Sequence, residues 1–185
     1  MMKKYLLLGS LATMLLITGC QTTQGGAGNT TETAGTDGTA GQYNSVEEKV
    51  MAIEQQLQTI YFDYDKFNIR SDMVDAVNSN SELLKATVAD LAAGIAPEAA
   101  ANAANVSLRI RVEGNTDEWG TDEYNQALGN KRAVSVRDAL VGNGFTRDVI
   151  EHVTYGETNP VCSEKTDDCW SKNRRVDFKL VLEPK

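Results

Sequence analysis

Apolar and polar side chains alternate most clearly in two segments of the chain, 106–113 and 176–182. In the first segment one set of alternate positions is apolar and the other is polar or charged: Val106, Leu108, Ile110 and Val112 against Ser107, Arg109, Arg111 and Glu113. In the second, the apolar set is Val176, Phe178, Leu180 and Leu182. A period of two predicts strands with one dry face. Shorter β-rich runs at 59–62 and 152–155 predict two further strands.

Helical spacing of apolar residues predicts three helices. The first covers 45–58 and begins with a capping-box sequence, Ser45-Val46-Glu47-Glu48. The second is capped by Ser71 or Asp72, ends near Gly94 and Pro97, and has an apolar stripe made of Val74, Val77, Leu84, Val88 and Leu91. The third covers 121–141 and is closed by Gly142-Asn143-Gly144. We also expect short helical turns at 98–105 and 147–150.

The order of these elements from residue 59 onward is β-α-β-α-β-β. It predicts an α/β two-layer sandwich, in which two main helices cover one face of a small mixed sheet. Any parallel pair of strands should be joined by a right-handed connection. We therefore expect residues 59–185 to form one domain, preceded by the helix 45–58.

The first twenty residues have the pattern of an export signal. Two lysines precede an apolar run from Tyr5 to Ile17, which is too short to span a membrane, and small residues precede Cys20. The segment Ile17-Thr18-Gly19-Cys20 resembles the lipobox of bacterial lipoproteins, which implies cleavage after residue 19 and lipid on Cys20. An ordinary secreted protein with a chance cysteine is the alternative. Residues 20–44, rich in glycine and threonine, predict a flexible tether.

Charge and cysteine content narrow the class of protein further. The chain has 18 basic and 26 acidic residues, and loss of Lys3 and Lys4 with the signal changes the net charge from −8 to −10. Such an acidic chain argues against a nucleic-acid partner. Cys162 and Cys169 lie close together in an oxidising compartment and predict a disulfide. The single histidine, His152, lies far from both in sequence, so we expect neither a metal site nor a cofactor.

The segment 114–133 has the strongest candidate chemistry. Asn125, Gly129 and Arg132 lie on one face of the predicted helix, and a glycine inside a helix indicates that something approaches closely there. Asp117 lies where the preceding strand ends, so Asp117 and Arg132 can face one cleft. An aspartate and an arginine together suit a zwitterionic ligand, whose ammonium and carboxylate they would bind. A structural ion pair is the alternative.

Three groups of residues resemble the OmpA-like peptidoglycan-binding domain, and more narrowly the peptidoglycan-associated lipoproteins. They are Tyr61-Phe62-Asp63-Tyr64-Asp65-Lys66, the segment from Asp117 to Gly129, and Asn173-Arg174-Arg175-Val176. The resemblance covers about residues 59–183 and agrees with the lipobox and the tether. It implies that Asp117 and Arg132 grip the free end of meso-diaminopimelate in the peptidoglycan stem peptide. It also implies that Phe62, Asp63 and Asn125 line that pocket.

The resemblance further implies an outer-membrane lipoprotein that faces the periplasm and joins membrane to cell wall. Members of this group work with a TolB-like periplasmic protein during constriction at division. An OmpA-like lipoprotein that anchors the wall without Tol partners is the alternative, and a cell-wall hydrolase is a third reading. Asp117 and Glu118 are adjacent and point apart on an extended chain, which does not suit a carboxylate-pair glycosidase. We therefore expect no enzyme. Asn115 and Trp119 depart from the usual histidine and arginine of these lipoproteins, which bears on pocket polarity or the partner surface.

Overall fold

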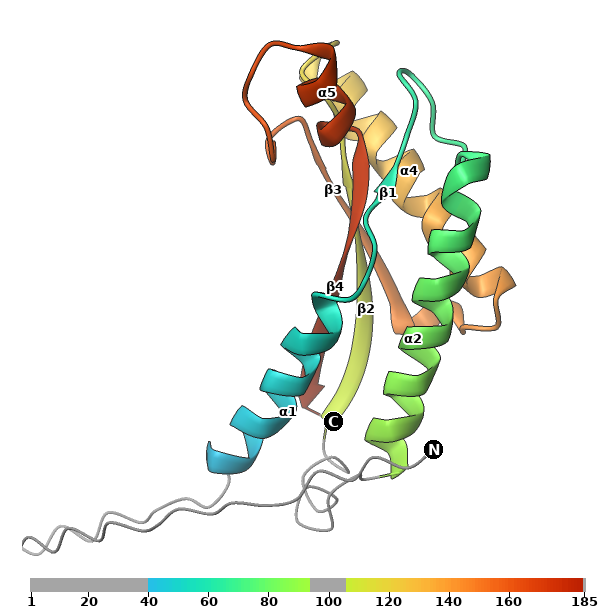
Figure 1. Ribbon diagram of the computed structural model, residues 1–185, viewed down its shortest axis with the longest axis vertical. Coiled ribbons are helices and arrows are strands. Elements are labelled where there is room, and N and C mark those ends of the chain that lie inside the picture. Colours follow the sequence, from blue (N-terminus) through green and yellow to red (C-terminus); the bar gives the residue numbers. More distant parts are fainter. Residues whose placement is uncertain (1–39, 94–105, 185) are drawn as a thin grey trace, which may run out of the picture. The chain divides into compact units, whose positions relative to one another are not determined.

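A computed structural model describes residues 40–93 and 106–184 of the chain (Figure 1). The predicted signal, the lipidation site Cys20, the tether as far as residue 39 and the Ala/Asn-rich segment 98–105 lie outside the described residues. No helix in the described ranges is long and apolar enough to cross a membrane.

The described part of the chain is built on a four-stranded mixed sheet. The strands are β1 (Ile60–Tyr61), β2 (Val106–Asn115), β3 (Ile150–Gly156) and β4 (Arg175–Pro184), in the order β1-β4-β2-β3. β4 pairs antiparallel with both β1 and β2, whereas β2 and β3 are parallel. The predicted mixed α/β sheet and all four strand positions are confirmed.

The two faces of the sheet follow the alternation in the sequence. Ile110 and Val112 of β2 and Val176, Phe178 and Leu180 of β4 are buried in one core with residues of the helices. Helix α2 (Val74–Ala93) and helix α4 (Asp122–Gly142) contribute Val77, Leu84, Ala133, Val136 and Leu140 to that core. The opposite face of β2 and β4 presents polar residues.

Helix α4 crosses the sheet with its backbone against β2, which explains the glycine inside it. A Cβ on Gly114 would lie 2.0 Å from the carbonyl oxygen of Gly129, and a Cβ on Gly129 would lie 2.4 Å from Oγ1 of Thr154. Neither distance is compatible with a side chain. The close approach predicted at Gly129 is therefore confirmed, and the approaching group is the sheet. The Thr121 side chain caps α4 by accepting from the Tyr124 amide, and Asn143 follows its last turn.

Helix α2 differs from its predicted pattern at both its start and its buried face. Ser71–Met73 form a 3-10 turn, η1, and Asp72 pairs with Arg70 instead of capping the helix. Val74 and Val88, which were predicted in the apolar stripe, are exposed. Three polar residues are buried on this helix because each has a hydrogen-bond partner: Asn80 bonds the Gln58 backbone, Ser81 the Val77 carbonyl, and Thr87 the Leu83 carbonyl.

Helix α1 (Ala40–Glu54) begins at Ala40, so the predicted start at the Ser45 capping box is wrong, as is the predicted end at residue 58. It packs Val50 into the core. Its last residue, Glu54, accepts from the Leu180 amide at 2.6 Å and from the Lys179 ammonium at 3.2 Å. β1 pairs only with the first two residues of β4, so α1 covers the part of the β4 edge that β1 leaves open.

One helix was not predicted. The segment between β3 and β4 was expected to be a loop, but it contains helix α5 (Asp167–Asn173), capped by the Thr166 side chain. The predicted disulfide between Cys162 and Cys169 is confirmed and joins α5 to the chain before it, with Cα atoms 5.2 Å apart.

Candidate functional site

Arg132 is the most deeply buried charged side chain of the predicted site. It extends from α4 and is fully buried. Its Nε donates to the Lys66 carbonyl (2.8 Å), Nη1 to the Asn115 carbonyl (2.9 Å) and Nη2 to the Asp63 carbonyl (3.2 Å). These bonds use three of the five guanidinium N–H groups and leave one hydrogen on each terminal nitrogen. Arg132 therefore joins the loop after β1 to the end of β2 and keeps donors for a ligand.

The charge on Arg132 persists at neutral pH. Burial lowers the pKa of its guanidinium to about 10, with the nearby Asp117 carboxylate opposing and the Arg174 guanidinium adding to that shift. The guanidinium also lies over the Phe62 ring, 5.4 Å from its centroid. Phe62 thus forms an apolar wall that shields the cation from water.

Asp117 lies on the loop between β2 and α4 and is 2 % exposed. Its Oδ2 accepts from Nη1 of Arg174 at 3.0 Å. Among the ion pairs of the described residues there is none between Asp117 and Arg132. The alternative of a direct structural ion pair between these two residues is therefore wrong, because Asp117 is held by a different arginine.

Arg174 is the site residue that the sequence analysis missed. It directly precedes β4, and its Nε donates to the Phe62 carbonyl at 3.3 Å. The Phe62 amide in turn donates to the Arg174 carbonyl at 2.9 Å. The only sequence signal was the pair Arg174-Arg175, and nothing in the pair says which arginine faces the site. In the structure Arg174 pairs with Asp117 and Arg175 pairs with Asp177 on the other face of the sheet.

The remaining predicted residues divide between the site and its surroundings. Asp63 contributes its backbone carbonyl, whereas its carboxylate is exposed and pairs with Lys66 at 3.1 Å. Asn125 is fully buried on α4, but its amide nitrogen donates to the Glu157 carboxylate and its Oδ1 has no partner. The structure thus brings Phe62, Asp63 and Arg132 into contact, links Asp117 to them through Arg174, and ties Asn125 to the segment after β3.

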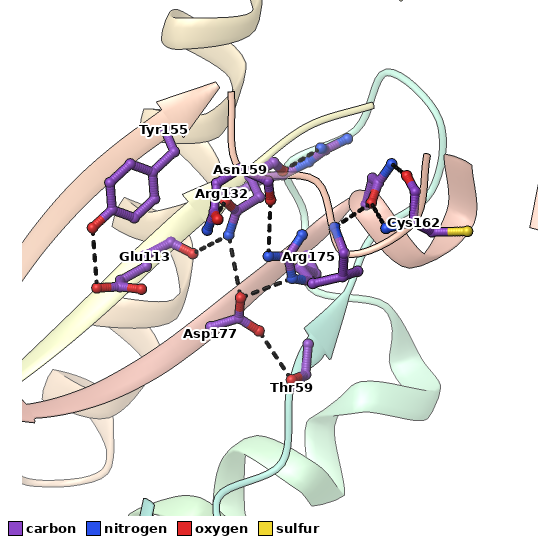
Figure 2. Close-up of polar contacts among 11 residues, drawn as sticks. Thr59, Glu113, Arg132, Tyr155, Asn159, Cys162, Arg175 and Asp177 are labelled. Atoms are coloured by element: carbon purple, nitrogen blue, oxygen red, sulfur yellow. Dashed lines mark hydrogen bonds and ion pairs between the residues drawn. The ribbon is translucent and has the colours of Figure 1, made fainter. Parts of the chain in front are cut away.

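The side chain of Asn115 takes part in a polar network with Glu113, Asp177 and Asn159, which Figure 2 labels together with Arg175. Its Nδ2 donates to the Glu113 carbonyl (3.0 Å) and to Asp177 (3.4 Å), and its Oδ1 accepts from Asn159 (3.2 Å). Arg175 bonds Asp177 at 2.7 Å and the Asn159 carbonyl at 3.1 Å. Only the Asn115 backbone takes part in the site, through the bond from Arg132.

The two tryptophans lie together at the edge of this region. The Trp119 and Trp170 rings meet edge to face, with centroids 5.2 Å apart, and Trp119 is half exposed. His152 is partly buried, with Nδ1 3.2 Å from Nη1 of Arg137. The ranges 40–93 and 106–184 contain no group of histidine, cysteine and acidic residues arranged to hold a metal ion.

Residues 61–174 match the OmpA family, which is more than half of the chain and includes Phe62, Asp117, Arg132 and Arg174. The chain belongs to the OmpA family. Within the family it is similar to the peptidoglycan-associated lipoprotein of Pasteurella multocida, with 35% identity over 127 residues that cover 69% of this chain and 73% of that protein. It is 30% identical to the Pseudomonas aeruginosa protein of the same name, over 90% of each chain.

Solved structures give the same assignment. The crystal structure of the peptidoglycan-associated lipoprotein from Burkholderia pseudomallei matches with a TM-score of 0.55 and 30% identity, covering 69% of this chain and 93% of that one. The C-terminal domain of Helicobacter pylori MotB matches with a TM-score of 0.53 at 20% identity, covering 68% and 85%, and is similar in fold. The OmpA-like resemblance read from the sequence is confirmed, and the proteins from Pasteurella multocida, Pseudomonas aeruginosa and Burkholderia pseudomallei share the lipoprotein name.

Proposed function

We propose that this OmpA-family chain binds peptidoglycan non-covalently, with Asp117 and Arg132 recognising the zwitterionic free end of meso-diaminopimelate in the stem peptide. The observation that carries the proposal is the pairing of a buried cation with a buried anion that do not neutralise each other directly. Arg132 keeps one free hydrogen on each terminal nitrogen while its other bonds go to backbone carbonyls. Its planar guanidinium suits a carboxylate, and Asp117 suits an ammonium.

The surrounding residues support this assignment of roles. Arg174 holds the Asp117 carboxylate in one orientation, and the Phe62 ring excludes water from one side of Arg132. A site with fixed groups loses little entropy when it binds a ligand. Asn125 is buried on α4 two helical turns before Arg132, and its Oδ1 has no hydrogen-bond partner, so this oxygen is a further acceptor next to the site.

The test is sedimentation of the purified full chain with isolated sacculi, with and without free meso-diaminopimelate. We expect free diaminopimelate to compete with binding and Nα-acetyl-lysine methylamide not to compete. This lysine derivative has an ammonium but no carboxylate on the same carbon, so it lacks the zwitterionic end and is the matched control. Undiminished sedimentation at saturating diaminopimelate would contradict the proposed ligand.

The wider role follows from the same assignment. We infer an outer-membrane lipoprotein anchored through lipid on Cys20, with residues 20–44 as the tether and the domain in the periplasm. The names of the relatives support this placement. A TolB-like periplasmic protein is the further partner, for a role in envelope constriction at division. Capture of such a protein from periplasm by the wild-type chain tests it, and its failure with intact wall binding would favour a wall anchor that works without Tol proteins.

The proposed activity is binding and includes no reaction. The alternative of a cell-wall hydrolase predicts release of soluble muropeptides when the purified chain is incubated with sacculi. Chromatography of the supernatant measures this directly, with a lysozyme digest as the positive control.

A further inference from the structure

A pocket lies beside the loop that contains Asp117. It has a volume of about 240 Å³ and is lined by residues of the loop after β2, the segment after β3 and helix α5. Its lining includes Thr116 and Glu118, the two neighbours of Asp117, together with Glu157, Glu164 and Trp170. Asp117, Arg132 and Arg174 are not among its lining residues, although it adjoins the site described above through Glu157, which accepts from Asn125.

The pocket is acidic. Glu118, Glu157 and Glu164 contribute three carboxylates, and none of the lining residues, all of which belong to the described part of the chain, is a lysine or an arginine. Glu157 and Glu118 each have one contact already, to the Asn125 amide and to the Trp170 indole nitrogen (3.0 Å). A carboxylate accepts several hydrogen bonds, so both keep acceptor capacity.

An unpartnered hydroxyl provides an independent sign of a ligand. Thr116 is 2 % exposed, and its Oγ1 has no hydrogen-bond partner although the side chain lines the pocket. A buried hydroxyl without a partner is costly, and such groups in native proteins call for an explanation. A donor that enters the pocket would satisfy this oxygen and the carboxylates together.

The walls of the pocket are fixed covalently and by hydrogen bonds. The disulfide connects Cys162, which lines the pocket, to Cys169, the neighbour of Trp170 on α5. The Asn173 side chain accepts from the Val161 and Cys162 amides at 3.0 and 3.2 Å and donates to the Cys162 carbonyl at 2.7 Å. The loop after β3 is therefore held against α5, as expected for a preformed site.

We propose that this pocket receives a lysine side chain from a protein partner. Its volume is below the roughly 300–1,000 Å³ of sites for drug-sized molecules, so it fits one side chain. An ammonium has three donors and no acceptor, which matches a lining that includes three carboxylates and the hydroxyls of Thr116 and Ser163. The half-exposed Trp119 beside Trp170 supports a protein partner, because exposed tryptophans are enriched at protein interfaces.

The experiment uses the two indole N–H signals of the ¹⁵N-labelled full chain, which has two tryptophans. Nα-acetyl-lysine methylamide is titrated to about 20 mM, because contacts of a single side chain bind in the millimolar range. The Nε-acetylated derivative is the neutral control, and glucosamine represents an amine of the cell wall. We expect a saturable shift of the Trp170 signal with the lysine probe alone, and a lower affinity at higher salt.

Two variants and a matched control locate the effect. Glu164→Gln and Thr116→Val should each weaken the lysine probe by roughly threefold or more, as expected when one hydrogen-bonding group is removed. Glu123→Gln, which changes the same charge on exposed α4 surface, should leave the affinity unchanged. Sedimentation of all three variants with sacculi should match wild type, which separates this site from the proposed peptidoglycan site.

Several results would overturn the proposal. These are the absence of a saturable shift, equal responses to the charged and neutral probes, or an affinity that neither pocket variant changes. Tighter binding of glucosamine than of the lysine probe, or loss of sacculus binding in Thr116→Val, would assign the pocket to the wall instead of a protein.

Discussion

Replacing Asp117 with asparagine should separate binding from folding at the proposed peptidoglycan site. The substitution keeps the shape of the side chain and removes its charge. The ammonium of the ligand then loses one charge-assisted hydrogen bond, which contributes about 1.5–3 kcal/mol. At about 1.4 kcal/mol per tenfold, the affinity for sacculi should fall roughly 10- to 150-fold.

The same substitution also has a cost for the folded state. Asp117 accepts from Arg174 at 3.0 Å, and both side chains are largely buried. The loss of one such bond should lower the free energy of unfolding by about 1–3 kcal/mol. Asp122→Asn is the matched control, since it removes the same charge from an exposed position in the first turn of α4.

Arg132→Ala should lower the free energy of unfolding more than Asp117→Asn does. Three carbonyl oxygens, those of Asp63, Lys66 and Asn115, would lose their donor in a buried environment. Each unsatisfied acceptor costs about 1–3 kcal/mol, so the total loss should be at least about 3 kcal/mol even if the contributions do not add. A loss of binding by this variant is therefore informative only where it remains folded.

The assay combines urea unfolding with sedimentation on sacculi at a temperature where each variant is folded. The reasoning is refuted if folded Asp117→Asn binds sacculi as well as Asp122→Asn does. A structural role alone predicts that binding falls only in proportion to the folded fraction, which the unfolding curves measure independently.

Four further outcomes can be measured on the same chain. Cys162→Ser with Cys169→Ser should lose about 2.5 kcal/mol, the chain-entropy estimate for an eight-residue loop, and an unchanged unfolding midpoint would contradict it. Cys20→Ala should abolish partition into the detergent phase, and retention there would rule out the lipid anchor. Gly114→Ala should destabilise the fold by more than about 3 kcal/mol, because its Cβ would lie 2.0 Å from a backbone oxygen of α4; thermal melts decide this. Burial raises the pKa of Glu113 above its ordinary 4.5, so the protonated carboxyl group stabilises the folded state fully at low pH and this contribution is lost as pH rises through the folded-state pKa. The urea midpoint of Glu113→Gln relative to that of wild type should therefore rise from pH 4 to pH 7, and a constant difference between the two midpoints would contradict this.

Regular patterns allowed most of the sheet and helix α4 to be predicted. The alternation in β2 and β4 survives in the structure because one face of each strand packs in the core and the other is polar. Thr121 and Asn143 mark the ends of α4 because their roles are local. The exposed Val74 and the buried Asn80 were not predictable in the same way, since tertiary contacts decide which side of α2 is buried.

Helix α5 and Arg174 lacked a sequence signal for physical reasons. Seven residues are too few to show helical periodicity, and α5 is stabilised by the Thr166 cap, the disulfide and its position in the fold. The direction of Arg174 depends on the pairing of β4 with its neighbours, which a sequence does not state. That Asp117 and Arg132 lie in the same region was predictable, because a strand end and the next helix are joined by a short loop; that Asp117 pairs with Arg174 was not.

The alternation of side chains that builds the core also divides the charged residues at this end of the sheet into two groups. Arg174 reaches Asp117, whereas Arg175 reaches Asp177 in the network on the opposite face. The register of β4 against β1, with Ile60 opposite Val176, fixes this division, and the paired bonds between Phe62 and Arg174 extend it to the site. A slip of one residue would exchange the two arginines and leave Asp117 facing the wrong neighbour. The short strand β1 therefore positions the charges of the proposed peptidoglycan site, although no β1 side chain belongs to it.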